Sequence, residues 1–199
     1  MKSQNLFLKF SILLFVAVIV VLASSCKKTE QTTENTDDDE IVFQLNNDQL
    51  GLSSRITYYN EPILFSKTGS KSNTNGHTWY YVADVESPMY NGGLLSATHV
   101  VIADDKAYVT YNRQGDEYAG GIEVIDLSNP AFPTLISSEL FGGVDVNAVA
   151  ADYNGNEAQR KIWLALSSFK KGAGLRQVIL EDGLLTSQIS DVNLSKSLS

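Results

Sequence analysis

A repeat of short strand-like runs is the feature that most restricts the folds available to this chain. Residues 82–88 (VADVESP) align with residues 124–130 (VIDLSNP), which places Asp84 and Asp126 at an offset of 42 residues. In each copy, apolar and β-branched residues lead to an acid and then to a proline. Self-similarity at a fixed spacing indicates an architecture built from repeated units.

A second set of matches extends the repeat toward the C-terminus. Residues 161–166 (KIWLAL) match residues 106–111 (KAYVTY), and residues 174–180 (GLRQVIL) match residues 121–127 (GIEVIDL) at an offset of 53. The period therefore drifts from about 42 to about 53 residues, with about four strand-like runs in each unit. This combination is typical of β-propeller blades whose loops differ in length.

The runs themselves indicate an all-β fold. They are rich in β-branched and aromatic residues and are separated by Gly, Asn, Asp and Pro, and no window after residue 41 keeps a helical period with capping residues. The clearest runs are residues 54–59, 79–85, 99–103, 106–111 and 121–127. We therefore predict about three four-stranded antiparallel propeller blades in residues 41–199.

One unit resembles a known repeat family. Residues 121–135 (GIEVIDLSNPAFPTL), preceded by residues 103–109 (ADDKAYV), resemble the LVIVD repeat, a bacterial and archaeal repeat associated with β-propellers. The resemblance implies a propeller fold and transfers no catalytic residues. In the matched segment we expect Asp126 to accept a backbone N–H group of the following turn, while Pro130 and Pro133 bracket the connection to an outer strand.

About three blades form an incomplete propeller, because closed rings typically contain four to eight. If about eight apolar side chains on each open face lost roughly 2 kcal/mol each, the total of about 16 kcal/mol would match the whole stability of a domain. Residues 194–199 (LSKSLS) also do not resemble a closing strand. We expect either that the chain is the N-terminal part of a longer protein or that it oligomerises.

The N-terminal residues 1–25 have the pattern of a signal peptide. Two lysines and no acid accompany the apolar run of residues 10–22, which is short for a membrane-spanning helix of about 20 residues. Small residues at positions 23–25 then lead to Cys26, the single cysteine of the chain. The pattern indicates export from the cytoplasm.

The boundary before Cys26 resembles the lipobox of bacterial lipoproteins, in which the cysteine thiol receives a diacylglyceryl group and becomes the mature N-terminus. Ala23 stands where leucine is commonest and Leu22 lies one position earlier, a loosened form that resembles the signals of Bacteroidota. We therefore predict lipidation of Cys26 and a location on the outer membrane. The alternative is cleavage by ordinary signal peptidase near Ala23, with Cys26 left as a free thiol.

Residues 26–40 are predicted to form a flexible tether. The segment 27–40 (KKTEQTTENTDDDE) has no apolar side chain, so it cannot bury enough surface to offset the entropy of ordering. Its acidic run at residues 37–40 resembles the signal that directs Bacteroidota lipoproteins to the cell surface. We expect the protein to face the exterior, with a periplasm-facing location as the alternative.

The charge balance excludes several classes of function. The chain has 15 basic and 23 acidic residues and a net charge of −8, which becomes −10 when the two lysines of residues 1–25 are removed. Such a chain has no basic stripe for nucleic acid, and anionic lipid surfaces repel it, which leaves the lipid on Cys26 as the membrane attachment. One cysteine beside only His77 and His99 gives no structural zinc set, and we predict no metal and no cofactor.

Few residues suggest a chemical site. Residues 152–157 (DYNGNE) offer oxygen ligands without the spacing of a calcium loop, and an Asn-Gly turn between two strands is the better interpretation. The aromatic runs 58–59 and 79–81, with Trp163, could stack sugars, although strand aromatics are more often core or cross-strand residues. We expect His99 to be a packed, hydrogen-bonded residue and not a catalytic base.

The loops 67–77, 112–119 and 168–173 fall at equivalent places in the units and are expected to share one face. Variable loops on a rigid scaffold commonly carry recognition, so this face is the predicted binding surface. The predicted function is non-catalytic binding or scaffolding of proteins or glycans by a lipid-anchored lipoprotein. The alternative is a propeller-fold hydrolase or lyase acting on extracellular glycans or peptides, which would need convergent acids, a histidine or a metal.

Overall fold

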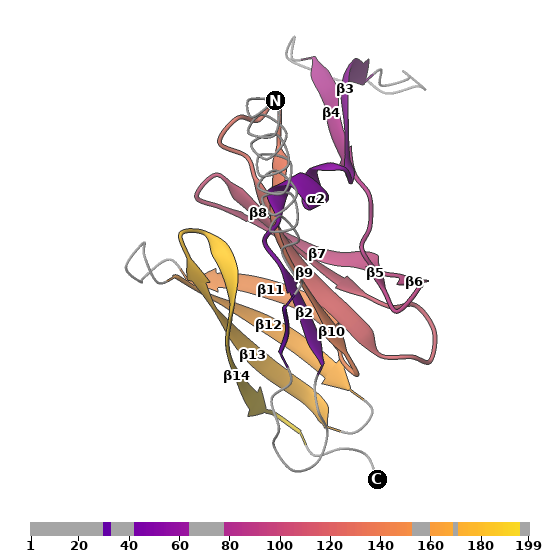
Figure 1. Ribbon diagram of the computed structural model, residues 1–199, viewed down its shortest axis with the longest axis vertical. Helices are drawn as coiled ribbons and strands as arrows, with labels where there is room; N and C mark the ends of the chain where they lie inside the picture. The colour runs from indigo at the N-terminus through magenta and orange to yellow at the C-terminus, as the bar shows by residue number, and fades with distance from the viewer. Residues whose placement is uncertain (1–29, 33–41, 64–77, 153–159, 169–170, 196–199) are drawn as a thin grey trace, which may run out of the picture.

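The computed structural model describes residues 30–32, 42–63, 78–152, 160–168 and 171–195 (Figure 1). Its elements are β1 (Glu30–Thr32), β2 (Phe43–Asn46), α2 (Gln49–Ser53), β3 (Ile56–Ile63), β4 (Trp79–Val85), β5 (Met89–Tyr90), β6 (Gly93–Leu94), β7 (Ser96–Ala103), β8 (Lys106–Asn112), β9 (Ala119–Asp126), β10 (Thr134–Gly142), β11 (Asp145–Asp152), β12 (Arg160–Ser168), β13 (Gly172–Glu181) and β14 (Leu184–Asn193). The predicted signal peptide, Cys26 and His77 lie outside the described residues.

Two antiparallel sheets make up most of this structure. Strands β7, β8, β9 and β10 follow one another in a four-stranded meander, to which β2 and then β1 add beside β10; we call these six strands the central sheet. Strands β11 to β14 form a second four-stranded meander, the C-terminal sheet. The prediction of an all-β fold is confirmed, with the short α2 as the one helix that is described.

The first of the predicted units, which we call the first unit, is smaller than expected. Around Asp84 the described residues form the two-stranded sheet β3–β4, followed by the short pair β5–β6. The prediction of a third four-stranded unit is therefore not met in the described part of the chain. The physical reason is that the residues before β3 are used elsewhere, because β2 joins the central sheet and α2 caps its outer face.

The sequence pattern does not predict strand β2. Phe43 pairs with Phe141 and Gln44 pairs with Leu140, so this short strand runs antiparallel to β10. The Phe43 ring is buried in the core between the two sheets. A segment close to the N-terminus thus supplies both a strand and a core side chain to the central sheet.

Tight hairpins connect consecutive strands in three places. The turns Asn91–Gly92, Asp104–Asp105 and Asp182–Gly183 each place two consecutive residues at positive φ. This is the conformation of a type I′ turn, whose twist matches that of the flanking strands, and Asn, Asp and Gly adopt it most readily. The short polar sequences between the strand-like runs therefore determine where the chain reverses.

The connection between β9 and β10 uses a side-chain cap. The Asp126 carboxylate accepts a hydrogen bond from the Ser128 backbone N–H at 2.9 Å, which confirms the expectation for this turn. The same hydrogen bond lowers the pKa of Asp126, because it favours the ionised form. Pro130 and Pro133 lie within this connection as predicted, but the strand that follows is not an outer strand, because β2 pairs with the other side of β10.

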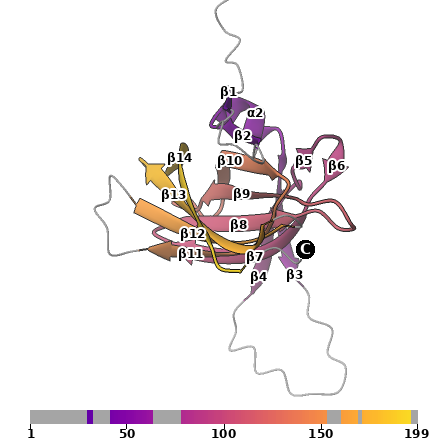
Figure 2. The same ribbon diagram turned by 90° about the horizontal axis from the view of Figure 1, so that it is seen from below.

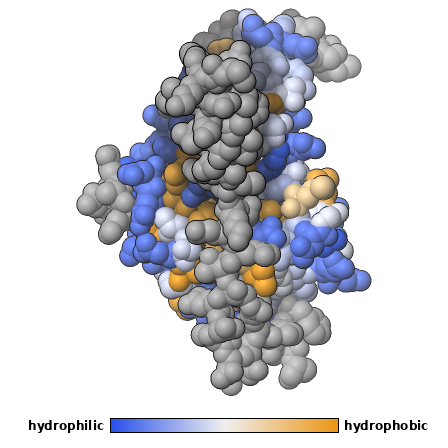
Figure 3. All heavy atoms as spheres, in the orientation of Figure 1, coloured by the Kyte–Doolittle hydropathy of each residue, from blue (hydrophilic) through white to orange (hydrophobic). Residues whose placement is uncertain are grey.

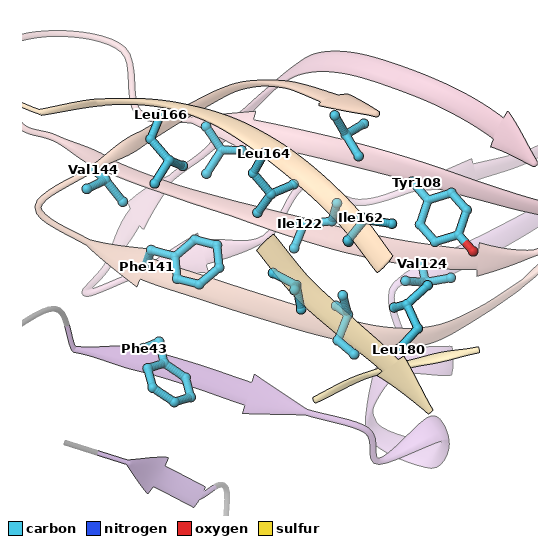
Figure 4. Close-up of a cluster of buried hydrophobic side chains, with 14 of the residues drawn as sticks. Phe43, Tyr108, Ile122, Val124, Phe141, Val144, Ile162, Leu164, Leu166 and Leu180 are labelled. Carbon is cyan, nitrogen blue, oxygen red and sulfur yellow. The ribbon is translucent and has the colours of Figure 1, made fainter. Parts of the chain in front are cut away.

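The two sheets pack face to face around the main core, as Figures 2 and 4 show. Side chains alternate across β9, so Ile122 and Val124 point toward the C-terminal sheet while Glu123 points away from it. Ile162 and Leu164 on β12 meet them from the other side. Further buried members of this core are Tyr108, Phe141, Val144, Val146, Val149, Leu166, Val178, Leu180 and Leu185.

The opposite face of the central sheet is covered by the first unit. One cluster joins Leu52 of α2 and Ile56 of β3 to Ile125 and Leu135 of the central sheet. A second cluster gathers Tyr90, Leu95, Tyr111, Ala119 and Leu140 under the β5–β6 pair. The base of the β3–β4 hairpin is therefore fixed to a rigid sheet, while its far end extends beyond it (Figure 1).

Truncating a leucine in the core between the sheets should cost much more stability than truncating a leucine on the surface. Leu164 is 0% exposed and Leu50 is 85% exposed. We expect Leu164→Ala to lower the free energy of unfolding by about 2–5 kcal/mol, and Leu50→Ala to change it by less than about 0.5 kcal/mol. Urea denaturation followed by circular dichroism checks both, and similar losses in the two variants would contradict the packing described.

Candidate binding surface

An exposed cluster of aromatic side chains occupies strands β3 and β4, which we call the aromatic hairpin. Trp79 is 63% exposed and Tyr80 is 53% exposed, and the remaining rings are also open to solvent: Tyr58, Tyr59 and Tyr81. In Figure 3 this part of the surface is mostly pale to blue, because Tyr and Trp are not strongly hydrophobic on that scale. The patch is therefore aromatic and amphipathic, and not aliphatic.

Two ring contacts order this cluster. Tyr59 of β3 stacks on Tyr81 of β4 with ring centroids 4.5 Å apart and an interplanar angle of 26°. Tyr58 meets Phe132 of the β9–β10 connection at 5.8 Å, and its hydroxyl donates to the Pro133 carbonyl at 2.9 Å. The hairpin is thus joined to the central sheet through Tyr58, while Tyr59 and Tyr81 support each other.

The expectation that these aromatics are core or cross-strand residues is met only in part. Tyr59 and Tyr81 are cross-strand partners, but none of the five hairpin aromatics is buried. Three consecutive aromatics at residues 79–81 must place rings on both faces of β4, because side chains alternate along a strand. A two-stranded sheet has no layer on both sides to cover these rings. The run of three aromatics is therefore the sequence feature that indicates exposed rings in such a hairpin.

The surface of the hairpin is also negatively charged. Glu61, Asp84 and Glu86 are exposed, and none of them forms a salt bridge among the described residues. Desolvation, followed by the negative charge and hydrogen bond of Asp84, raises the pKa of Tyr81. Aromatic rings and unneutralised carboxylates therefore lie side by side.

An ion pair between the partly exposed Arg55 and the buried Glu123 fixes the base of the aromatic hairpin. Arg55, which precedes β3, donates from Nη1 to Glu123 Oε1 at 2.5 Å and from Nη2 to Glu123 Oε2 at 3.0 Å. Ser138 Oγ donates to the same carboxylate at 2.9 Å. Arg55 also donates to the backbone carbonyl of Glu86, which follows β4. One guanidinium group thus links both ends of the hairpin to β9.

Tyr111 lies next to this ion pair and remains a neutral donor. Burial raises the pKa of Tyr111, and the negative charge of Glu123 raises it further, although Arg55 opposes the effect. A neutral tyrosine beside a carboxylate adds no charge to the interface between the hairpin and the central sheet. The network therefore holds one positive and one negative group.

A second buried charge, on Arg176, faces the space between the two sheets. Arg176 of β13 is 0% exposed and binds Asp191 through two contacts of 2.7 Å, and its guanidinium lies 4.7 Å from the centre of the Phe141 ring. Glu139 of β10 is also fully buried, and neither of its oxygens has a hydrogen-bond partner. Burial raises the pKa of Glu139 to about 8, with Arg176 opposing the rise. Asp191 accepts from Nε and Nη2 of Arg176, whereas Nη1 is buried without a hydrogen-bond partner among the described residues.

Two of the three predicted loops come together. The Asp145 carboxylate accepts the Ala119 N–H at 3.3 Å beside the β8–β9 loop, and Asp145 also pairs with Ser167 near the β12–β13 connection. Residues 67–77 lie outside the described residues. The strands that flank them, β3 and β4, extend from the end of the central sheet where Ile56 contacts Ile125, which is opposite the β8–β9 loop. The described structure therefore presents the hairpin apart from the other two loops.

The remaining predicted positions carry little chemistry. His99 is exposed and its Nδ1 accepts the Val149 N–H at 3.3 Å, so it is hydrogen-bonded as expected but not packed. Of residues 152–157 only Asp152 is described, at the end of β11. Within the described ranges, no three His, Cys, Asp or Glu side chains gather as metal ligands. No helix in those ranges is long and apolar enough to span a membrane.

Removing the arginine of the hairpin anchor should destabilise the protein strongly. We expect Arg55→Met to lower the free energy of unfolding by about 3–5 kcal/mol, because Glu123 would remain buried without its counter-charge. The double variant Arg55→Met with Glu123→Gln should recover part of the loss. The matched control Arg113→Met removes a pair whose carboxylate, on Glu117, is exposed, and should cost at most about 1 kcal/mol. Equal losses in the two single variants, measured by urea denaturation, would contradict the anchor.

The stability of the protein should fall as pH rises from about 5 to about 8. Glu139 has a raised pKa in the folded state, so over this range the folded protein retains a proton that the unfolded chain has lost. The free energy of unfolding of the unaltered protein, compared with that of Glu139→Gln, should therefore decline by a few kcal/mol across the range. Urea denaturation of both proteins at several pH values checks this. Parallel pH profiles would show that Glu139 ionises normally.

Comparison of the chain with protein-family models, with curated proteins and with solved structures finds no match in any of the three. No known active site or binding site can therefore be transferred to its residues. The functional argument depends on the aromatic hairpin, on the buried charges that position it and on the sequence signals outside the described residues.

Proposed function

We propose that this chain is a lipid-anchored lipoprotein of the outer membrane that faces the cell exterior and presents a non-catalytic, propeller-type repeat for binding proteins or glycans. The observation that carries the binding role is the exposed aromatic hairpin on a rigid sheet. Exposed Tyr and Trp side chains are enriched where proteins make contact, since they supply large contact areas together with a polar group.

The stacking of the two meanders supports the propeller-type arrangement. The first strands, β7 and β11, lie next to each other, and so do the fourth strands, β10 and β14. Figure 2 shows the strands of both sheets following the same order across the molecule. Neighbouring propeller blades require this alignment, and the resemblance of residues 121–135 to the LVIVD repeat favours the same arrangement.

The N-terminal sequence supports the anchored location. A single lipid-length chain binds a membrane only reversibly, since each buried CH₂ contributes about 0.8 kcal/mol, whereas the two or three chains of a bacterial lipoprotein hold it firmly. The acidic segment of residues 26–40 follows directly on the predicted lipid site, although residues 30–32 within the predicted tether pair with β2 as strand β1. The hairpin would be available to partners outside the cell.

Replacing the lipidated cysteine tests the anchor. In a bacterial host whose lipoproteins follow this signal pattern, we expect Cys26→Ala to move the protein from the membrane fraction to the soluble exported fraction. Intact-mass measurement of the unaltered protein should show cleavage before Cys26 and the added acyl chains. An unmodified thiol on the purified protein would contradict lipidation.

A screen for turnover separates binding from catalysis. The purified full chain should show no turnover of polysaccharides or peptides above that of a boiled sample. Robust turnover would favour the propeller enzyme instead.

A fluorescent label that cannot cross membranes should react with the protein on whole cells if the protein faces the exterior.

A further inference from the structure

The aromatic hairpin leaves one strand edge available for pairing. Among the described strands, β3 and β4 pair only with each other. The edge of β3 is interrupted by a bulge between Tyr58 and Glu61 and by Pro62, which lacks a backbone N–H. Proteins commonly protect exposed edges with bulges and prolines. β4 contains no proline and the extra residue of the bulge lies on β3, so the β4 edge keeps its backbone donors and acceptors for a further strand.

The side chains beside this edge favour a positively charged partner. Residues 56–63 and 79–86 contain three acids and no base. Glu61, which pairs with Tyr81 across the hairpin, and Asp84 are exposed, and neither is neutralised by a salt bridge among the described residues. Aromatic faces attract cations, and opposite charges across an interface guide and fix association. The hairpin is therefore complementary to lysine or arginine side chains.

We propose that the β4 edge binds an extended basic segment of a partner protein as an added β-strand. The inference rests on the proposed binding function and names the class of its partner. A polypeptide satisfies the open backbone groups of β4 along its length, which a glycan does not do. Its basic side chains reach Glu61 and Asp84, while Trp79 and Tyr80 provide the kind of aromatic contacts that dominate protein interfaces.

A synthetic peptide tests this proposal directly. The probe is a capped peptide of alternating lysine and valine with 7 residues, the length of β4, titrated by calorimetry into the full chain in non-ionic detergent. The double variant Glu61→Gln, Asp84→Asn should weaken binding roughly five- to tenfold at low ionic strength. Trp79→Ala should also weaken it at least about fivefold, and its exposed position makes a folding defect easy to exclude by circular dichroism.

A matched charge control locates the site. Asp116→Asn with Glu117→Gln removes the same two charges from the β8–β9 loop at the opposite end of the central sheet, and we expect the dissociation constant to stay within about twofold. Equal weakening by both double variants would mean attraction to the acidic protein as a whole and would overturn the proposal. Weaker peptide binding only in the variant Asp116→Asn, Glu117→Gln would also overturn the proposal.

A backbone-modified peptide tests strand addition. A peptide with the same side chains but N-methyl groups on every second backbone nitrogen cannot pair fully, and should bind about tenfold more weakly. Equal binding of the two peptides would overturn strand addition. Binding of a neutral oligosaccharide that depends on Trp79, without peptide binding, would overturn the partner class and leave the anchored binding function standing. Failure of lipidation at Cys26 would instead remove the anchor without affecting peptide binding.

Discussion

The direction of the aromatic hairpin depends on the ion pair between Arg55 and Glu123. Glu123 has no exposed surface, so its charge must be matched inside the protein, and Arg55 supplies both the charge and two of the hydrogen bonds. Because Arg55 also binds the carbonyl of Glu86, any rotation of the hairpin would break contacts at both of its ends. The ion pair therefore adds directional contacts to the apolar packing at the hairpin base.

The position on the C-terminal sheet that is equivalent to Glu123 carries a residue of opposite charge. Glu123 lies on β9 and Arg176 on β13, the third strands of the two meanders, and each side chain points toward the preceding unit. Glu123 meets Arg55 there, whereas Arg176 meets Phe141 and the unpaired Glu139. Glu123 is buried in one of these interfaces between units and Arg176 in the other. A unit placed in the wrong order would bury like or unpaired charges, which is strongly unfavourable.

Much of the fold could be predicted because its determinants are local. Alternating apolar runs and the polar turn residues between them are enough to place β8, β9, β12 and β13, and Asp126 caps its turn as its spacing indicates. Strand β2 could not be found in this way, because four residues carry little periodicity and their role depends on Phe43 reaching Phe141 far along the chain. The ion pair at the hairpin base could not be predicted for the same reason, since Arg55 and Glu123 lie 68 residues apart.

The exposed aromatics could not be predicted because burial depends on what covers a strand. The apolar run of β4 resembles that of a core strand, and it is the number of strands around it that leaves Trp79 and Tyr80 in solvent. A hairpin with rings on both faces cannot be stabilised by one supporting sheet, and an isolated pair of strands is marginal in water. The anchor at its base and the Tyr59–Tyr81 stack offset part of that deficit. A partner strand along β4 would supply the third strand that such a hairpin lacks.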